Sequence, residues 1–235
     1  MIPLKDDVPS QRVPLVTLAV IGLNVAVFVY QLTLQLGPDP DTQRAAEDFV
    51  LEFGVVPCRL TGQCRVPGDF PHPVLTVFTS MFLHGGLLHL GGNMLYLWIF
   101  GNNVEDTLGH GRFGVFYLTS GLAAALAQIM MSPASTIPMV GASGAVSGVL
   151  GAYFLLFPYS RVLTLVTFGF FWRFIHLPAV IVLGLWIALQ FVSGYLSLGV
   201  AGGAEGGVAF FAHIGGFLAG MGLLFVLRPR RSRRL

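Results

Sequence analysis

Six long apolar segments constrain the fold of this chain more strongly than any other feature of its sequence. Each is close to the ~20 residues that a helix needs to cross a bilayer. Charged residues make up only 10% of the chain, against about 25% in an average soluble domain. The sequence therefore predicts an all-α, polytopic membrane protein. Its six predicted transmembrane helices cover roughly residues 14–36, 86–104, 113–131, 141–157, 177–198 and 207–227.

Two apolar stretches need separate interpretation. The first segment could be a cleaved signal peptide, but it is long, and residues 31–40 contain no small-x-small cleavage site. We therefore expect a retained helix. The stretch 162–174 is apolar but too short to span a bilayer, and Arg173 interrupts it. We predict that this stretch is an interfacial or loop segment.

The distribution of charge predicts the orientation in the membrane. With six spans, the basic residues gather on the side that both termini share, while acidic residues outnumber basic ones in the connection at 37–73. Positive residues mark the cytoplasmic side of a membrane, so we expect both termini in the cytoplasm. The arginine-rich tail could be a nucleic-acid patch. Directly after a membrane helix, however, an orientation signal or a contact with anionic lipid is favoured.

The chain has no internal repeat and is interpreted as one membrane domain. We expect a cytoplasmic N-terminus at 1–13, the six-helix domain at 14–227 and a basic cytoplasmic tail at 228–235. Within the domain, residues 37–85 form a long outward loop.

The hydrophilic part of this loop is rich in proline. Six prolines between residues 38 and 73 are expected to exclude a long helix across it. The loop also contains both cysteines of the chain. Cys58 and Cys64 could form one disulfide or remain free thiols.

A serine and a histidine lie in glycine-rich motifs of two different apolar segments. Ser143 belongs to Gly-Ala-Ser-Gly at 141–144, and His213 to Ala-His-Ile-Gly-Gly at 212–216. Polar groups at bilayer depth are costly and usually mark function. Small residues let two helix backbones approach closely, and only then can a serine hydroxyl come within about 2.6–3.2 Å of an imidazole. The pattern indicates a nucleophile and its general base. The alternative is ordinary helix packing with an incidental serine and histidine.

The partners of this pair are less clear from the sequence. No acidic residue lies in the apolar segment around His213, and Glu205 in the preceding loop would have to fold back to orient the ring. A Ser-His dyad is therefore a simpler prediction than a triad. Ser147 lies one turn after Ser143 on the same helix face and is a rival hydroxyl.

A second polar group lies at the start of the segment 86–104. His89 and Asn93 are four residues apart and share a helix face. Both can donate hydrogen bonds, as stabilisation of an oxyanion requires. Zinc binding is disfavoured because His84 and His89 are five residues apart and no HExxH motif occurs. For His84 we favour a role in capping or satisfying the loop. The sequence indicates no metal site.

Taken together and in order, these motifs closely resemble the rhomboid family of intramembrane serine proteases over nearly the whole chain. The motifs that carry the resemblance are His84-x4-His89-x3-Asn93, Gly-Ala-Ser-Gly at 141–144, Ala-His-Ile-Gly-Gly at 212–216, Val-Glu-Asp at 104–106 and the run 174–184.

The resemblance implies a six-helix rhomboid bundle with a Ser143–His213 dyad in a water-accessible cavity below the outer surface. It implies an oxyanion hole formed by His89, Asn93 and the Ser143 backbone N–H. The supporting residues would be His84, Gly141, Gly144, Gly216 and Glu105, with Glu105 structural at the inner end of the second helix.

The resemblance also implies a function. The chain would be a serine endopeptidase of the plasma membrane that cuts single-pass membrane proteins in or near their transmembrane segment. Its partners would be these substrates and membrane lipid, without nucleic acid, cofactor or metal. The fifth helix or the connection at 198–207 could admit substrate. The alternative is a catalytically inactive rhomboid-like protein that binds membrane helices.

Two positions depart from the pattern of the family. Some members carry an aromatic residue one turn after the nucleophile, where it packs on the catalytic histidine. Here that position is Ser147. The outward loop also lacks the Trp-Arg pair of some bacterial members.

Overall fold

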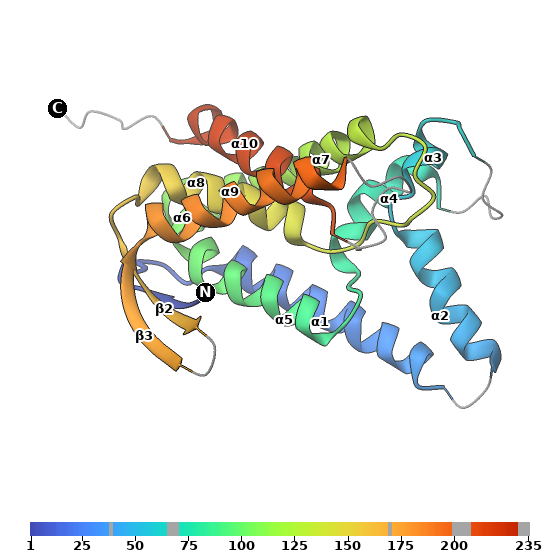
Figure 1. Ribbon diagram of the computed structural model, residues 1–235, viewed down its shortest axis with the longest axis horizontal. Helices are drawn as coiled ribbons and strands as arrows, with labels where there is room; N and C mark the ends of the chain where they lie inside the picture. Colours follow the sequence, from blue (N-terminus) through green and yellow to red (C-terminus); the bar gives the residue numbers. More distant parts are fainter. Residues whose placement is uncertain (38–39, 65–70, 169–170, 199–207, 230–235) are drawn as a thin grey trace.

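The computed structural model describes residues 1–37, 40–64, 71–168, 171–198 and 208–229. Within these residues the chain is mostly helical, as the sequence predicts. The long helices lie side by side roughly along the long axis of the molecule (Figure 1). The helices are α1 (Leu15–Gln35), α2 (Pro40–Phe53), α3 (Pro57–Leu60), α4 (Pro73–Thr79), η1 (Ser80–Phe82), α5 (Leu87–Tyr96), the π-helical η2 (Leu97–Gly101), α6 (Asn102–Leu108), α7 (His110–Met131), α8 (Ser143–Leu156), α9 (Ala179–Ser197) and α10 (Phe210–Leu227).

These helices make the chain a multi-pass membrane protein. Among the described residues, α1, α7, α9 and α10 are each long and apolar enough to cross a bilayer. Residues 73–82 and 87–108 form a fifth candidate if this pair, bent by 82°, counts as one span. α8 is also apolar but has only 14 residues. The count of six spans therefore stays a prediction.

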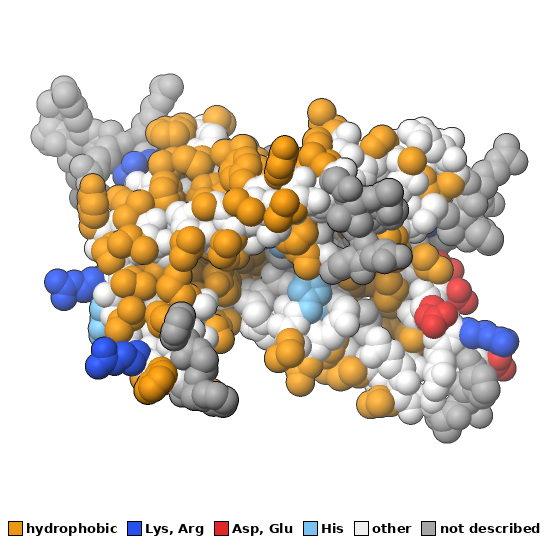
Figure 2. Space-filling view, viewed as in Figure 1, with side chains coloured by type: hydrophobic (Ala, Val, Ile, Leu, Met, Phe, Trp, Pro, Cys, Tyr) orange, Lys and Arg blue, Asp and Glu red, His pale blue; other side chains and the backbone are white. Residues whose placement is uncertain are grey.

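The surface has the polarity of a membrane protein. Hydrophobic side chains cover the middle of the molecule in Figure 2, whereas most of the lysine and arginine side chains visible in this view lie at one end. The acidic side chains visible in this view lie at the opposite end, beside α2. Lipid solvates the apolar belt, and the polar ends face water or lipid headgroups.

A small antiparallel sheet covers the basic end of the molecule. Its strands are β1 (Ile2–Asp6), β2 (Arg161–Phe168) and β3 (Phe171–Pro178), in the order β1-β2-β3. The prediction of a loop or interfacial segment at 162–174 missed this hairpin. Valine, threonine and aromatic residues favour strands, but pairing with β1 joins segments about 160 residues apart, which no local pattern reveals.

Two carboxylates attach the N-terminal part of the chain to the helices. Asp6 accepts hydrogen bonds from the side chains of Asn103 (2.6 Å) and Tyr153 (2.5 Å). Glu105 accepts from the backbone N–H groups of Val16 and Thr17 at 2.9 and 2.8 Å. These are free N–H groups in the first turn of α1, so Glu105 caps this helix from a distant part of the chain.

The outward loop contains more helix than its prolines suggest. The 14 residues of α2 begin at Pro40 and end at Phe53. Proline is well tolerated at the first position of a helix, so Pro40 can start α2. Because α2 ends at Phe53, it does not run across the whole loop, which agrees with the prediction from the prolines. Beyond α2, Cys58 and Cys64 form a disulfide. Val55 pairs with Met139, which joins the loop to the segment before α8.

Glycines bring the backbones of α8 and α10 into direct contact. A Cβ atom on Gly216 would lie 2.1 Å from the carbonyl oxygen of Gly144. On Gly220 it would lie 2.0 Å from the carbonyl oxygen of Gly148. Any larger residue would force the two helices apart. The short distance between the N-terminal ends of α8 and α10 follows from this seam.

Candidate active site

Ser143 and His213 both lie in the first turn of their helices. α8 begins at Ser143, two residues after Gly141, whose φ of +121° lies in a region that residues other than glycine rarely adopt. The N–H of Gly141 donates to the carbonyl of Ser80, which ties this turn to η1. His213 is the fourth residue of α10. Both side chains therefore emerge at the same end of the α8–α10 seam.

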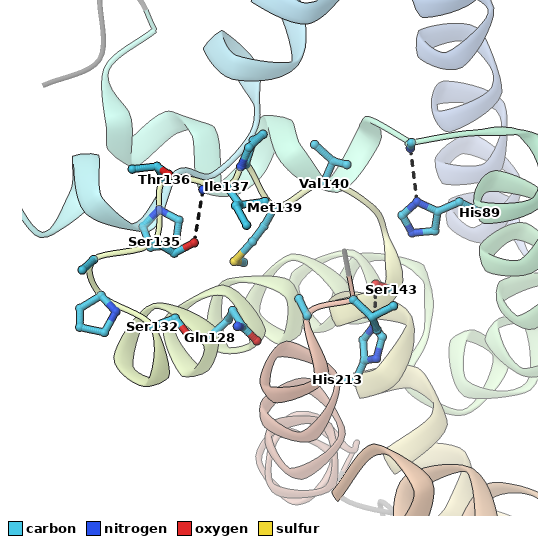
Figure 3. Close-up of a pocket in the computed structure, with 17 residues that line it drawn as sticks. His89, Gln128, Ser132, Ser135, Thr136, Ile137, Met139, Val140, Ser143 and His213 are labelled. Carbon is cyan, nitrogen blue, oxygen red and sulfur yellow. Dashed lines mark hydrogen bonds between the residues drawn. The ribbon is translucent and has the colours of Figure 1, made fainter. Parts of the chain in front are cut away.

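The two side chains contact one another. Ser143 Oγ and His213 Nε2 are 2.9 Å apart, and both residues are half-buried. Figure 3 shows them facing each other from α8 and α10. A hydroxyl hydrogen-bonded to an imidazole is the arrangement of a nucleophile with its general base.

The rival hydroxyl is engaged elsewhere. Ser147 is 1% exposed, and its Oγ donates a 2.6 Å hydrogen bond to the backbone carbonyl of Ser143. This bond, from one turn to the preceding one, satisfies a buried hydroxyl inside an apolar helix. Its geometry favours Ser143 over Ser147 as the partner of His213.

The other ring nitrogen of His213 has a partner that sequence reasoning missed. Nδ1 lies 2.7 Å from Oε1 of Gln190 in α9. The Trp186 ring, one turn earlier on α9, has its centroid 5.8 Å from that of His213. Glu205, the acid considered from the sequence, lies outside the described residues. A glutamine inside an apolar segment was the available signal, because such a group requires a partner.

A second glutamine fixes the start of α10. Gln128 Oε1, near the end of α7, accepts hydrogen bonds from the N–H groups of Phe211 and Ala212 at 3.1 and 3.3 Å. The first N–H groups of a helix have no partner within it, so this side chain acts as a cap. It holds the turn that carries His213, and sequence reasoning did not identify it.

A cavity of about 820 Å³ opens beside the pair. Ser143, His213, His89 and Gln128 line it with polar side chains, and the segment 132–140, with the hydroxyls of Ser132, Ser135 and Thr136, forms much of its wall. Figure 3 shows this segment on one side of the cavity and His89 on another. The mixture of apolar surface and a few converging polar groups is typical of a substrate site.

His89 approaches the pair across Gly141. A Cβ atom on Gly141 would lie 2.7 Å from His89 Cε1 and 2.8 Å from Nε2. The imidazole therefore fits only against a glycine. Nδ1 of His89 accepts a 3.3 Å hydrogen bond from the N–H of Gly85, which leaves Nε2 as its N–H donor.

The other two predicted residues of this group do not line the cavity. Asn93 is 8% exposed, and one of its amide hydrogens is used in a 3.0 Å bond to the carbonyl of His89. His84 is fully buried, and its ring packs on that of His89 at 5.0 Å. Its backbone N–H donates to Gln31 Oε1 at 3.0 Å, which holds this turn against α1.

The donor set around the cavity does not suit a metal ion. The described parts of the chain contain no group of three or more His, Cys, Asp or Glu side chains that could hold one. The site instead combines a hydroxyl, two imidazoles and an amide in a cavity. Those groups can activate a nucleophile and donate hydrogen bonds to a carbonyl oxygen.

The fold and this site together define a polytopic membrane protein with a paired serine and histidine at a cavity. The chain belongs to the rhomboid family, because residues 71–230 match the Rhomboid domain. The resemblance seen in the motifs is thereby confirmed at the level of the family.

Relatives of this chain occur in different kingdoms. It is 29% identical to Rhomboid protein 1, mitochondrial, of Saccharomyces cerevisiae over 92% of the chain and 56% of that relative. It is 33% identical to RHOMBOID-like protein 1 of Arabidopsis thaliana over 68% of the chain and 36% of the relative. It is 36% identical to Rhomboid protease GluP of Bacillus subtilis over 58% of the chain and 25% of the relative. The match thus spans about half or less of each of these relatives.

Proposed function

We propose that this chain is an intramembrane serine endopeptidase that works through a dyad of Ser143 and His213. The observation that carries the proposal is the 2.9 Å contact between Ser143 Oγ and His213 Nε2 at the edge of the cavity. The names of its relatives, among them a rhomboid protease, support the same reaction class. The proposed substrates are single-pass membrane proteins, cut in or near their transmembrane segment.

The proposed reaction has two halves. His213 Nε2 takes the proton of the Ser143 hydroxyl while Oγ attacks the scissile carbonyl, and the bond between carbonyl carbon and amide nitrogen then breaks. His213 returns the proton to the leaving amine, leaving an acyl-enzyme. Water, deprotonated by the same imidazole, attacks the ester and releases Ser143. The substrate helix must unwind locally first, because helical hydrogen bonds shield its carbonyls.

Stabilisation of the oxyanion would come from the start of α8 and from α5. Ser143 is the first residue of α8, so its backbone N–H is free of intrahelical bonds and lies at the positive end of the helix dipole. His89 Nε2 is the proposed side-chain donor, supported by its position against Gly141. Asn93 is the second proposed side-chain donor, because one amide hydrogen remains beside the one that it donates to the carbonyl of His89.

The proposed setting is a plasma membrane with both termini in the cytoplasm. The sheet, Lys5 and Arg228 lie on the basic side of the chain, whereas the disulfide lies in the loop expected to face outward. Positive charge marks the cytoplasmic side, and disulfides persist in oxidising compartments. Residues 14–227 are proposed to form the protease domain. No cofactor or nucleic acid is part of the proposal.

Labelling with a fluorophosphonate probe tests this function directly. The wild-type protein, purified in detergent, should be labelled, and Ser143→Ala and His213→Ala should lose labelling while their helical content is unchanged. Ser147→Ala is the matched control and should keep it. A reporter with a helix-breaking residue in its transmembrane segment should be cleaved by the same variants that label.

Absence of labelling and of cleavage in a folded wild type would refute the proposal. A rhomboid protease that labels in parallel would exclude failure of the probe. Binding of the reporter without cleavage would then identify the chain as a rhomboid-like protein that holds membrane helices without cutting them.

A further inference from the structure

The imidazole of His213 is held from two sides by polar side chains of different helices. Nε2 contacts Ser143 of α8 at 2.9 Å, and Nδ1 contacts Oε1 of Gln190 of α9 at 2.7 Å. Gln190 is half-buried, whereas its neighbours in α9 at 188–189 and 191–192 are exposed. The amide thus occupies the place that a carboxylate takes in a Ser-His-Asp triad.

The chemistry of an amide oxygen fixes which nitrogen carries the proton. A neutral imidazole has one N–H, and a carbonyl oxygen can only accept. Contact with Oε1 therefore requires the hydrogen on Nδ1. Nε2 is then left with its lone pair directed at the Ser143 hydroxyl, which is the state that a general base needs.

We propose that Gln190 is a positioning residue for the catalytic histidine and completes a Ser143–His213–Gln190 triad. The inference rests on the proposed function and extends it to a residue of α9. Gln190 does not touch the reacting atoms; it acts by selecting the tautomer and the orientation of the His213 ring.

A neutral partner suits this environment better than an acid. An ionised carboxylate would have to be desolvated among apolar helices, whereas an amide presents a similar acceptor oxygen at much lower cost. The amide cannot stabilise the imidazolium by charge. Its contribution is therefore positioning, which makes it smaller than that of a triad aspartate.

A second side chain of α9, that of Trp186, also contacts His213. Trp186 is one turn before Gln190, so both side chains project from one face of α9 toward His213. On the α8 side, the small residue Ser147 leaves no ring to pack on the imidazole. Orientation of the ring is thus supplied mainly by α9, while α8 supplies the nucleophile.

Two substitutions at the same position separate acceptor chemistry from packing. Gln190→Met keeps the length of the side chain but removes the acceptor, and Gln190→Glu keeps an acceptor oxygen. Leu189→Met is the matched control, because Leu189 is the adjacent residue on α9 and is 53% exposed. The measurements are the rate of fluorophosphonate labelling, the pH profile of kcat/KM on the reporter, and thermal unfolding.

Gln190→Met should lower kcat about tenfold or more, with KM nearly unchanged. The loss should not exceed the roughly 10²–10⁴-fold that a general base contributes. Leu189→Met should behave like wild type. Gln190→Glu should recover most of the lost rate. Its acid limb should move to higher pH, because a carboxylate beside the imidazole favours the protonated ring. His89 is the other ionisable side chain among the described residues that line the cavity, and it is unchanged in all three variants.

A folded Gln190→Met protein with the kcat and pH profile of wild type would overturn this inference. An equal loss in Gln190→Met and Gln190→Glu, with both proteins folded, would overturn it too, since the acceptor is retained in only one. Both results require an active wild type. An inactive wild type, with Ser143→Ala indistinguishable from it, would instead refute the proposed function.

Discussion

His213 lies between two helices that hold it in different ways. Against α8 the contact is backbone on backbone, with Gly216 and Gly220 of α10 lying on carbonyl groups of α8. Against α9 the contact is made by side chains, chiefly Gln190 and Trp186. At Gly194, α9 is not packed tightly against α10, because a Cβ atom there would lie 3.4 Å from Phe210 Cβ, which is a van der Waals distance. We infer that α8 sets the distance between serine and histidine and that α9 sets the orientation of the ring.

The largest effect should come from breaking the backbone seam. Gly220→Ala places a methyl group 2.0 Å from the carbonyl oxygen of Gly148, so α8 and α10 must separate. We expect the free energy of unfolding to fall by about 1–3 kcal/mol, as for overpacked cores. A displacement of about 1 Å should also slow fluorophosphonate labelling up to about 100-fold.

Gly222→Ala is the control for this substitution. It lies on the same helix and would meet no atom within 4 Å. Unfolding in detergent and the labelling rate should both match wild type. Equal behaviour of the Gly220 and Gly222 variants would contradict a structural role for the seam.

A smaller effect is expected on the side-chain contact of α9. Trp186→Leu removes the ring beside His213, and such aromatic contacts are worth about 0.5–1.5 kcal/mol. If this energy restrains the catalytic orientation, the labelling rate should fall about two- to tenfold. Trp98→Leu removes a tryptophan that is 53% exposed and should leave the rate unchanged. A loss of stability without any loss of rate in Trp186→Leu would assign the ring to packing alone.

Gly194→Ala sharpens the contrast between the two interfaces. The same glycine-to-alanine change as at Gly220 meets only van der Waals contacts here. The gain in helix propensity is at most about 1 kcal/mol, so stability should change little and the labelling rate should stay within about twofold. A severe loss would show that α9 and α10 are packed as tightly as α8 and α10.

The smallest effect on the labelling rate is expected for a substitution at the basic end of the molecule. Burial raises the pKa of the Asp6 carboxyl, against the opposing hydrogen bond from Tyr153. Folding therefore favours the protonated form, and stability falls as the pH rises from the ordinary pKa of 3.8 through the raised one. Asp6→Asn removes this titration, because an amide does not ionise.

Unfolding of wild type and Asp6→Asn should therefore be compared at pH 4 and pH 7. The free energy of unfolding of the variant minus that of wild type should be larger at pH 7 than at pH 4. The labelling rate at pH 7 should not change, since Asn103 and Tyr153, which donate hydrogen bonds to Asp6, do not line the cavity. If this difference were larger at pH 4 than at pH 7, the result would contradict the raised pKa of Asp6.

Much of the fold could be predicted from local patterns. The apolar segments became α1, α7, α8, α9, α10 and the helix that runs from α5 to α6, with boundaries shifted by a few residues. Glycines beside Ser143 and His213 indicated a close helix contact, and the backbones do touch there. The catalytic roles of these residues stay predictions until the labelling experiment.

Other elements could not be predicted, because their partners are remote in sequence. β1 and β2 pair across most of the chain. α2 was missed for a local reason, because Pro40 lies at the first position of the helix, where proline is tolerated. Gln128 and Gln190 were visible as polar residues in apolar segments. Which backbone or ring each one meets depends on how α7 and α9 are rotated about their axes.

The sequence by itself indicated that the chain lies in a bilayer, which family it belongs to, and that Ser143 and His213 form a pair. A bilayer demands long apolar segments, and close backbone packing demands glycine, so both leave local signatures. Only the tertiary structure decided how His213 is oriented, which N–H groups are capped and where the cavity opens. Those properties depend on hydrogen bonds of 2.7 to 3.3 Å between different helices, and such distances are set by packing angles rather than by residue spacing.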